Sequence, residues 1–234
     1  MTGNGSERGN LRHEQAAATR GLLLAAACDV FEDRGYKATT VGAITDRAET
    51  AHGTFYLYFR NKEDAFCRVV EAVIADELVV GDIVPRGPAA RTAIEDGVRS
   101  FVGLYERHAG LWRALLEGML QSPRVRQVWL DLRRELVDRL AGALAAQQQA
   151  GAMRTFDAAA VSHALSAMTE WSAFTHLVLG EPPVGEGSPE ALVATLTDLW
   201  VRALYGVLPE ARGSDAAERL DGRQDERGDE ERRP

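Results

Sequence analysis

The stretch "TTVGAITDRAETAHGTFYLYFRNKED", residues 39–64, decides the fold of the amino-terminal part of the chain. Its apolar spacing predicts a helix over 40–48, a turn at 49–51 and a second helix over 52–58. Two helices joined in this way form a helix-turn-helix, whose second helix lies in the major groove of DNA while the first crosses the backbone. The stretch therefore predicts a surface that contacts DNA.

The aromatic residues of this stretch fall on two sides of the second helix. Phe55 and Phe59 are four residues apart and are expected to face inward against the preceding helices. The hydroxyls of Thr54, Tyr56 and Tyr58 are left outside, where they can reach phosphate groups. A lysine follows at the start of the next helix, whose free N–H groups favour an anion. The alternative for each aromatic side chain is a place in an ordinary core. The outward-facing set is Thr54, Tyr56, Tyr58 and Lys62.

The overall charge does not indicate a nucleic-acid binder. The formal net charge is -8, and residues 1–67 carry eight basic and nine acidic side chains. A contact with DNA must therefore depend on the local arrangement of side chains, because the charge of the whole domain does not favour it.

Apolar spacing is helical along nearly the whole chain, which predicts an all-α fold of about nine helices. Gly35 is expected to end the first helix, and four later helices begin at the capping residues Asn61, Ser122, Asp157 and Ser188. The segment "VVGDIVPRGPAA", residues 79–90, punctuates the chain between short and long helices. The expected divisions are a disordered arm at 1–17, a three-helix head at 18–66, a helical body at 67–208 and a disordered charged tail at 209–234.

Composition excludes several classes of protein. Hydrophobic residues make up 45% of the chain, which supports a core. No segment approaches the roughly 18 apolar residues of a membrane span, and the first 20 residues lack the apolar run of a secretory signal. Cys28 and Cys67 have neither metal-ligand nor redox spacing, which fits a reduced cytoplasm. The histidines form no HExxH motif and no phosphate-binding glycine loop occurs, so no metal, cofactor or catalytic residue is predicted and an α-helical enzyme is the weakest hypothesis.

The amino-terminal segments "FEDRGYKATTV" (31–41), "GTFYLYF" (53–59) and "NKED" (61–64) resemble the tetracycline-repressor (TetR/AcrR) family. The resemblance implies a homodimeric repressor in which a ligand-binding helical body controls the distance between two DNA-reading heads. It implies binding to double-stranded operator DNA. Carried over position by position, the expected DNA contacts are Thr40, His52, Gly53, Thr54, Tyr56, Tyr58 and Lys62.

Two positions of the head depart from the family pattern. Glu49 stands where family members usually have glycine, at a turn position that often needs positive φ, and a side chain there costs on the order of 1 kcal/mol. Ala51 replaces the usual hydroxyl cap of the reading helix, which loses roughly 0.5–2 kcal/mol of stabilisation. These departures affect affinity and geometry rather than the assignment itself.

The body holds all four tryptophans, and we expect an apolar pocket between its helices with a few polar groups for orientation. The alternative is that these aromatic residues form an ordinary core. The segments "MTEWSAFTHLVLGEPP" and "LVATLTDLWVRALYG" are similar to the ethionamide-monooxygenase repressor branch, which implies an aromatic-lined tunnel for elongated apolar ligands. If the carboxylate of Glu170 is buried, it needs a histidine or arginine partner. The expected pocket residues are Phe101, Tyr105, Trp112, Trp129, Glu170, Trp171 and Phe174.

The last two helices, expected at 157–180 and 188–207, are joined by a short loop and should lie antiparallel. Their apolar faces can form a four-helix dimer bundle, or they can close the core of a single subunit; the resemblance favours the dimer. The expected interface residues are Ala164, Ala167, Leu177, Leu192, Leu196, Leu199 and Ala203.

These features together predict a ligand-responsive homodimeric transcriptional repressor in the cytoplasm. It would bind a palindromic operator and be released by a small, elongated apolar effector. The alternative is a DNA-binding protein of the same fold that answers to a protein partner or acts in chromosome organisation. A body filled by its own side chains would favour that alternative.

Overall fold

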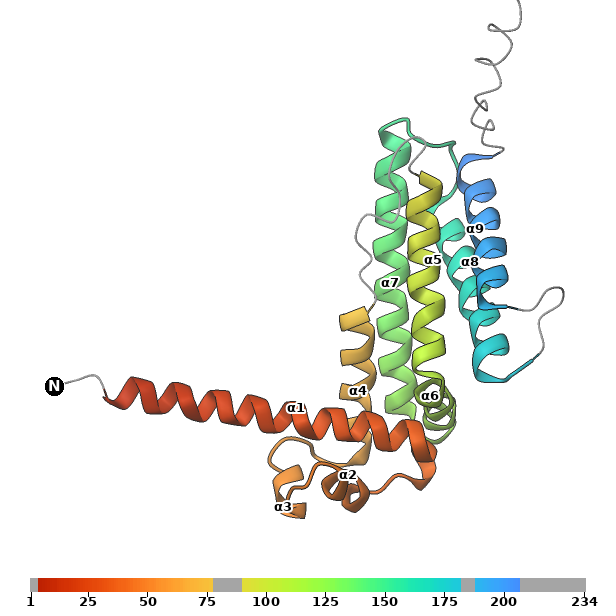
Figure 1. Ribbon diagram of the computed structural model, residues 1–234. Helices are drawn as coiled ribbons and strands as arrows, with labels where there is room; N and C mark the ends of the chain where they lie inside the picture. Colours follow the sequence, from red (N-terminus) through yellow and green to blue (C-terminus); the bar gives the residue numbers. More distant parts are fainter. Residues whose placement is uncertain (1–3, 78–89, 182–187, 207–234) are drawn as a thin grey trace, which may run out of the picture.

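The computed structural model describes residues 4–77, 90–181 and 188–206, and within these ranges it contains helices and no strand. In the head, α1 (Asn4–Ala38) lies across the foot of an upright body, and α2 (Val41–Arg47) and α3 (His52–Phe55) lie beneath it (Figure 1). The next helix, α4 (Lys62–Glu77), rises from the head along the body. The predicted all-α class and helix-turn-helix head are confirmed.

The body consists of long helices that stand side by side (Figure 1). Helix α7 packs against α8, α5 packs against α9, and α6 packs against α1 of the head. A π-helical segment, η2, continues directly from α8. The bounds are α5 (Ala90–Arg107), α6 (Ala109–Gln121), α7 (Pro123–Gln149), α8 (Ala158–Ala173), η2 (Phe174–Val178) and α9 (Pro189–Tyr205).

The predicted helix starts are confirmed by their capping hydrogen bonds. The side chain of Asn61 accepts from the N–H of Asp64 at 2.8 Å, and the hydroxyl of Ser122 accepts from Val125 at 3.1 Å. Asp157 and Ser188 cap α8 and α9 in the same way. Each cap satisfies an N–H group that the first turn of a helix leaves without an internal partner.

Two clusters of buried side chains hold the fold together. The first joins the head to the lower body and includes Phe31 of α1, Phe55 of α3 and Phe66 of α4. It extends to Trp112 in the body, so it crosses the expected division between residues 66 and 67. The second cluster fills the upper body between α5, α7, α8 and α9. The head and the lower body therefore share one core. Because such a core is closely packed, a displacement of one part is transmitted to the other.

The structure differs from the sequence-based expectation at three places. Helix α1 begins at Asn4, so residues 4–17 are helical rather than a disordered arm; good helix formers fill most of the second half of this segment, at 11, 12 and 14–17. At Gly35 the helical conformation is interrupted at positive φ (76°), as predicted, but α1 kinks there and continues to Ala38. The reading helix ends at Phe55, three residues before the expected position. The predicted tail at 209–234 lies outside the described residues.

Candidate nucleic-acid interface and effector pocket

The reading helix is anchored from its inner side. Phe55 and Phe59 are 0% and 2% exposed, as predicted, and their rings lie 5.3 Å apart. Thr40 caps α2, because its hydroxyl accepts from the N–H of Ala43 at 3.1 Å. This cap uses the hydroxyl of a residue that was predicted to contact DNA, although the side chain stays exposed.

The outer side of the reading helix presents part of the predicted contact set. His52 and Gly53 are exposed, and Tyr56 is 53% exposed with its ring 5.5 Å from that of His52. Thr54 is half-buried. These four residues lie on the reading helix and directly after it, where hydroxyl and imidazole groups are available to phosphates or base edges.

Tyr58 and Lys62 lie further inside than predicted. The chain turns after Phe55, with the N–H of Tyr58 donating to the carbonyl of Phe55 at 3.0 Å, and this turn packs Tyr58 against the core. Lys62 donates from Nζ to the main-chain carbonyls of Tyr36 at 2.9 Å and Lys37 at 3.2 Å. Burial lowers the pKa of the Lys62 ammonium, and the Glu117 carboxylate opposes this shift. Its first role is therefore to hold the end of α1.

The turn between α2 and α3 has the two features expected from the sequence, a positive φ at Glu49 and no side-chain cap at Ala51. Glu49 has φ of 50° and is the non-glycine residue with positive φ among the described residues. Ala51 precedes α3 in extended conformation and provides no side-chain hydrogen bond to cap it. The N–H of Thr50 instead donates to the carbonyl of Thr45 at 3.0 Å, which closes the turn through the backbone.

Arg60 is an exposed cation beside the reading helix that the predicted contact set left out. Arg60 follows Phe59 directly and is highly exposed, with its guanidinium 3.9 Å from Asp64. Its position after the aromatic motif was the available signal. By contrast, the exposed Arg47 is held by two carboxylates, Asp29 at 3.2 Å and Asp33 at 2.6 Å, which partly neutralise it.

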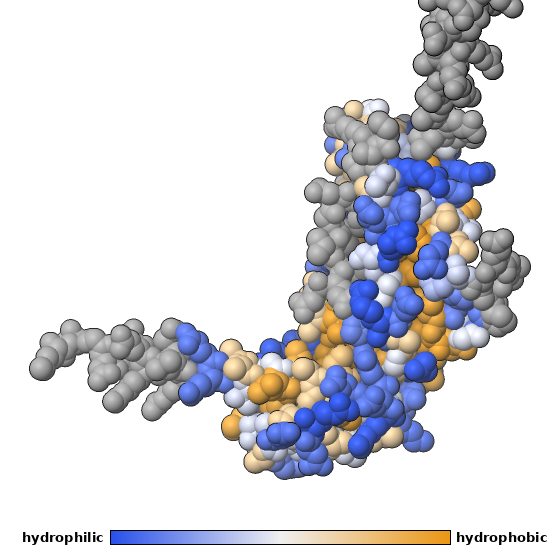
Figure 2. All heavy atoms as spheres, in the orientation of Figure 1, coloured by the Kyte–Doolittle hydropathy of each residue, from blue (hydrophilic) through white to orange (hydrophobic). Residues whose placement is uncertain are grey.

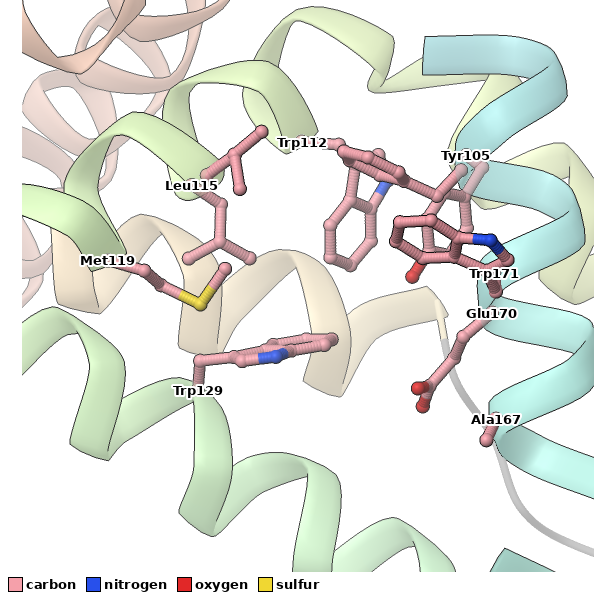
Figure 3. Close-up of a pocket in the computed structure, with 10 residues that line it drawn as sticks. Tyr105, Trp112, Leu115, Met119, Trp129, Ala167, Glu170 and Trp171 are labelled. Atoms are coloured by element: carbon pink, nitrogen blue, oxygen red, sulfur yellow. The ribbon is translucent and has the colours of Figure 1, made fainter. Parts of the chain in front are cut away.

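A pocket of about 340 Å³ lies in the body between α5, α6, α7 and α8. The aromatic side chains that line it come from these four helices and from the first residue of η2, and they converge on one space (Figure 3). This volume falls within the range of small-molecule sites, roughly 300–1,000 Å³. The lining residues are Tyr105, Trp112, Leu115, Leu116, Met119, Trp129, Ala167, Glu170, Trp171 and Phe174.

Stacked rings build the inner wall of this pocket. Tyr105 and Trp112 stack in parallel at 4.2 Å, and Trp129 meets Trp112 edge to face at 5.5 Å. Phe101, predicted in the pocket, lies behind this wall instead, with its ring 5.2 Å from that of Tyr105. Burial strongly raises the pKa of the Tyr105 phenol, and the negative charge of Glu170 adds to this effect.

One ion pair gives the pocket a polar side. Glu170 lies among the lining residues, and its Oε2 accepts from Nε of Arg133 on α7 at 2.7 Å. Both side chains are largely buried, at 19% and 18% exposure. Burial raises the pKa of the Glu170 carboxyl, while the hydrogen bond and charge of Arg133 act against the rise. The sequence predicted a histidine or an arginine as the partner of Glu170, but it did not identify Arg133.

The rim of the pocket is apolar and open to solvent. Trp171 is 65% exposed and stacks on Phe174 at 5.8 Å, and Leu116 on α6 is also exposed. Hydrophobic residues form a band along the body between hydrophilic patches (Figure 2). The predicted pocket was aromatic and did not include three lining residues of α6. These residues follow Trp112 by three, four and seven positions, so helical spacing could have placed them beside it. They are Leu115, Leu116 and Met119.

The residues predicted for a dimer interface are divided by the structure. Leu196 is 2% exposed in the core of the subunit, and Leu177 and Leu192 are half-buried against it. Ala167 faces the pocket. The outward-facing members are Leu199 and Ala164, with Ala203 half-buried. The structure thus leaves a narrower candidate face than the one predicted.

Among the described residues, no helix has both the length and the apolar character to cross a membrane.

Comparisons with known proteins agree with this architecture. Residues 23–68 match the bacterial regulatory proteins of the tetR family, and residues 94–206 match the carboxy-terminal domain of the transcriptional regulator EthR. The chain is 27% identical over 190 residues to the HTH-type transcriptional regulator EthR of Mycolicibacterium smegmatis, covering 80% of this chain and 86% of that protein. The EthR of Mycobacterium tuberculosis is 26% identical over 189 residues, covering 79% and 86%.

A solved structure shares the fold. A TetR-like transcriptional regulator from Rhodococcus sp. RHA1 superposes with a TM-score of 0.57 at 23% identity, covering 80% of this chain and 95% of that one. This likeness extends over the head and the body together.

Proposed function

We propose that this chain, which belongs to the TetR family of bacterial regulatory proteins, is a homodimeric repressor that is released from a palindromic operator by a small, elongated apolar molecule. It acts on DNA in the cytoplasm through the surface of His52, Gly53, Thr54 and Tyr56. Its effector enters the pocket past Trp171. The regulators of this family are not enzymes, which agrees with the absence of a predicted catalytic residue.

The observation that carries this proposal is the position of α6, which forms a wall of the pocket and also contacts the head. One side of α6 supplies Trp112 and Met119 to the pocket. On its other side, Glu117 accepts from the N–H of Lys37 at 3.1 Å. At Gly110 the helix approaches α1 so closely that a Cβ would lie 2.5 Å from the carbonyl oxygen of Glu32. A ligand that displaces α6 must therefore displace α1.

The chemistry of the pocket favours an apolar ligand with one polar end. Aromatic and aliphatic side chains provide most of the wall, and the Glu170–Arg133 pair provides a hydrogen-bonding side. Such a ligand releases the operator only if it binds the released arrangement of the heads better than the operator-bound one.

The test is a screen of elongated apolar compounds on the full chain, with tryptophan fluorescence and operator release measured together. All four tryptophans lie in the body, so a ligand should change fluorescence strongly and operator DNA weakly. Trp171→Ala should lose the fluorescence response while operator affinity stays within a few-fold. A compound set that changes neither signal, with a protein partner releasing the operator instead, would favour the alternative of control by a protein.

A further inference from the structure

We propose that Cys28, Glu32 and His108 form a zinc-type metal site at the crossing of α1 and the start of α6. The three side chains offer a sulfur, a carboxylate oxygen and an imidazole nitrogen, and these atoms all lie within 4.8 Å of one another. This is the donor set that Zn²⁺ accepts in proteins, whereas Mg²⁺ and Ca²⁺ favour oxygen ligands throughout. The site is separate from both the reading surface and the pocket.

The distances are close to those of a metal centre. Sγ of Cys28 lies 3.7 Å from Oε1 of Glu32, and Nδ1 of His108 lies 2.6 Å from the same oxygen. In a tetrahedral zinc site, with bonds of about 2.0–2.3 Å, the ligand atoms stand roughly 3.3–3.8 Å apart. The first distance already fits, and the second has to open by about 0.7 Å, which side-chain rotation supplies.

The fold brings the three ligands together without the help of an ion. Cys28 and Glu32 are four residues apart on α1 and therefore share one face. His108 stands at the N-cap of α6, and its carbonyl accepts from the N–H of Trp112 at 3.0 Å. The tight approach of Gly110 to the backbone of Glu32 fixes the first turn of α6 against α1. The ligands thus come from two rigid helices held in contact.

The exposure of the site suits an exchangeable ion. All three residues are half-buried, and the side chains of His108 and Glu32 are 19% and 27% exposed. An ion can enter from solvent and keep one coordination position for water, as in zinc sites with three protein ligands. Once bound, it would link the head helix to the helix that lines the pocket. A metal would then restrict the same α1–α6 contact on which release of the operator depends.

Sequence spacing alone does not show this site, because His108 lies 76 residues beyond Glu32. The hydrogen bond between His108 and Glu32 would exist without a metal, and it is the alternative explanation for that pair. In that metal-free arrangement the thiol of Cys28 donates to the same carboxylate oxygen of Glu32 instead of binding an ion. An experiment on the thiol therefore separates the two explanations.

The experiment is a titration of the reduced, metal-free full chain with Co²⁺, followed by displacement with Zn²⁺. Co²⁺ bound to a thiolate gives a charge-transfer absorption, which reports directly on the sulfur ligand. We expect one Co²⁺ per chain and loss of the absorption on adding zinc. Cys28→Ser should abolish the charge-transfer band. Glu32→Gln and His108→Gln should each weaken zinc binding by at least the roughly tenfold that loss of a hydrogen-bonding partner of a metal ligand costs.

Matched controls come from the same chain. Cys67→Ala removes the other cysteine, which is buried in the core, and His163→Gln removes an exposed histidine. Both should leave the band and the zinc affinity unchanged. The proposal is overturned if the wild-type chain gives no band, if the band survives Cys28→Ser, or if Glu32→Gln and His108→Gln bind zinc as tightly as the wild type. Circular dichroism of each variant verifies the fold. If His108→Gln does not fold, the result for Cys28→Ser decides between the two explanations.

Discussion

The ammonium of Lys62 lies 2.9 Å from the main-chain carbonyl oxygen of Tyr36 and 4.8 Å from the centre of the Tyr36 ring. It thereby ties the start of α4 to the end of α1, where the helix leaves carbonyl groups without internal partners. A cation at the end of a helix is also favoured by the helix dipole. Lys62 is thus a connection within the head before it is a contact with DNA.

Lys62→Met should lower the free energy of unfolding by about 1–2 kcal/mol, because hydrogen bonds from a charged donor are lost. Urea unfolding measures this change. The salt dependence of operator binding separates the two roles, since a lost phosphate contact would reduce the slope of log affinity against log salt by about 0.9. We expect a smaller reduction. Unchanged stability together with the full reduction would show that Lys62 acts on phosphate.

Tyr56→Phe should weaken operator binding without changing stability, because the side chain is half exposed and loses only its hydroxyl. The expected loss is about fivefold, in keeping with roughly 1 kcal/mol for one hydrogen bond. A contact with phosphate should lose this affinity on many DNA sequences alike. His52→Ala is the comparison, since a contact with a base edge should alter preference at one position. Equal affinity for wild type and Tyr56→Phe would remove Tyr56 from the interface.

Glu49→Gly should raise stability by up to about 1 kcal/mol, because glycine accepts the positive φ of 50° without steric cost. The gain is limited by the greater flexibility of glycine in the unfolded chain. Removal of a negative charge beside the reading helix should also strengthen operator binding at low salt. Thermal unfolding and binding at two salt concentrations test both effects. A less stable variant with weaker binding would indicate that the carboxylate braces the turn.

Gly110→Ala should separate α1 from α6, because the added Cβ would meet the backbone of Glu32 rather than a movable side chain. We expect a loss of about 1–3 kcal/mol in stability and weaker operator binding. Gly142→Ala in α7 is the matched control, since its added Cβ would meet no other helix and no side chain within 4 Å beyond its two chain neighbours. That variant should be as stable as the wild type or more so. If the two variants behave alike, the contact at Gly110 does not position the head.

Features that depend on neighbouring residues were predictable from the sequence. The caps at Asn61, Ser122 and Asp157 are short-range signals, and each is found where expected. The inward position of Phe55 and Phe59 follows from their spacing of four residues. The positive φ at Glu49 followed from the turn that the motif requires. In all of these, the partner lies within one or two turns of the chain.

For features that depend on distant partners, the sequence predicted only the kind of partner residue, or nothing. Lys62 binds carbonyls about 25 residues earlier, and Glu170 binds an arginine on another helix. Helix α9 shows the limit most clearly, because it has apolar residues on more than one side. The apolar spacing alone assigns these residues to one face of the helix, and the packing of α9 against α5 decides which of them are buried.

Leu199 and Leu196 stand on α9 only three residues apart, yet one is 44% exposed and the other 2% exposed. A charge at Leu196 would be buried in the core of the subunit, which costs several kcal/mol and should unfold the chain. Leu199→Glu should leave a folded subunit, because its side chain meets solvent in the single chain. If α8 and α9 form the dimer interface, this variant should be monomeric and lose tight operator binding, since two heads must reach major grooves about 34 Å apart. Sedimentation at micromolar concentration, with circular dichroism on the same samples, distinguishes unfolding from dissociation. A Leu199→Glu variant that remains a dimer would place the interface on another face of the body.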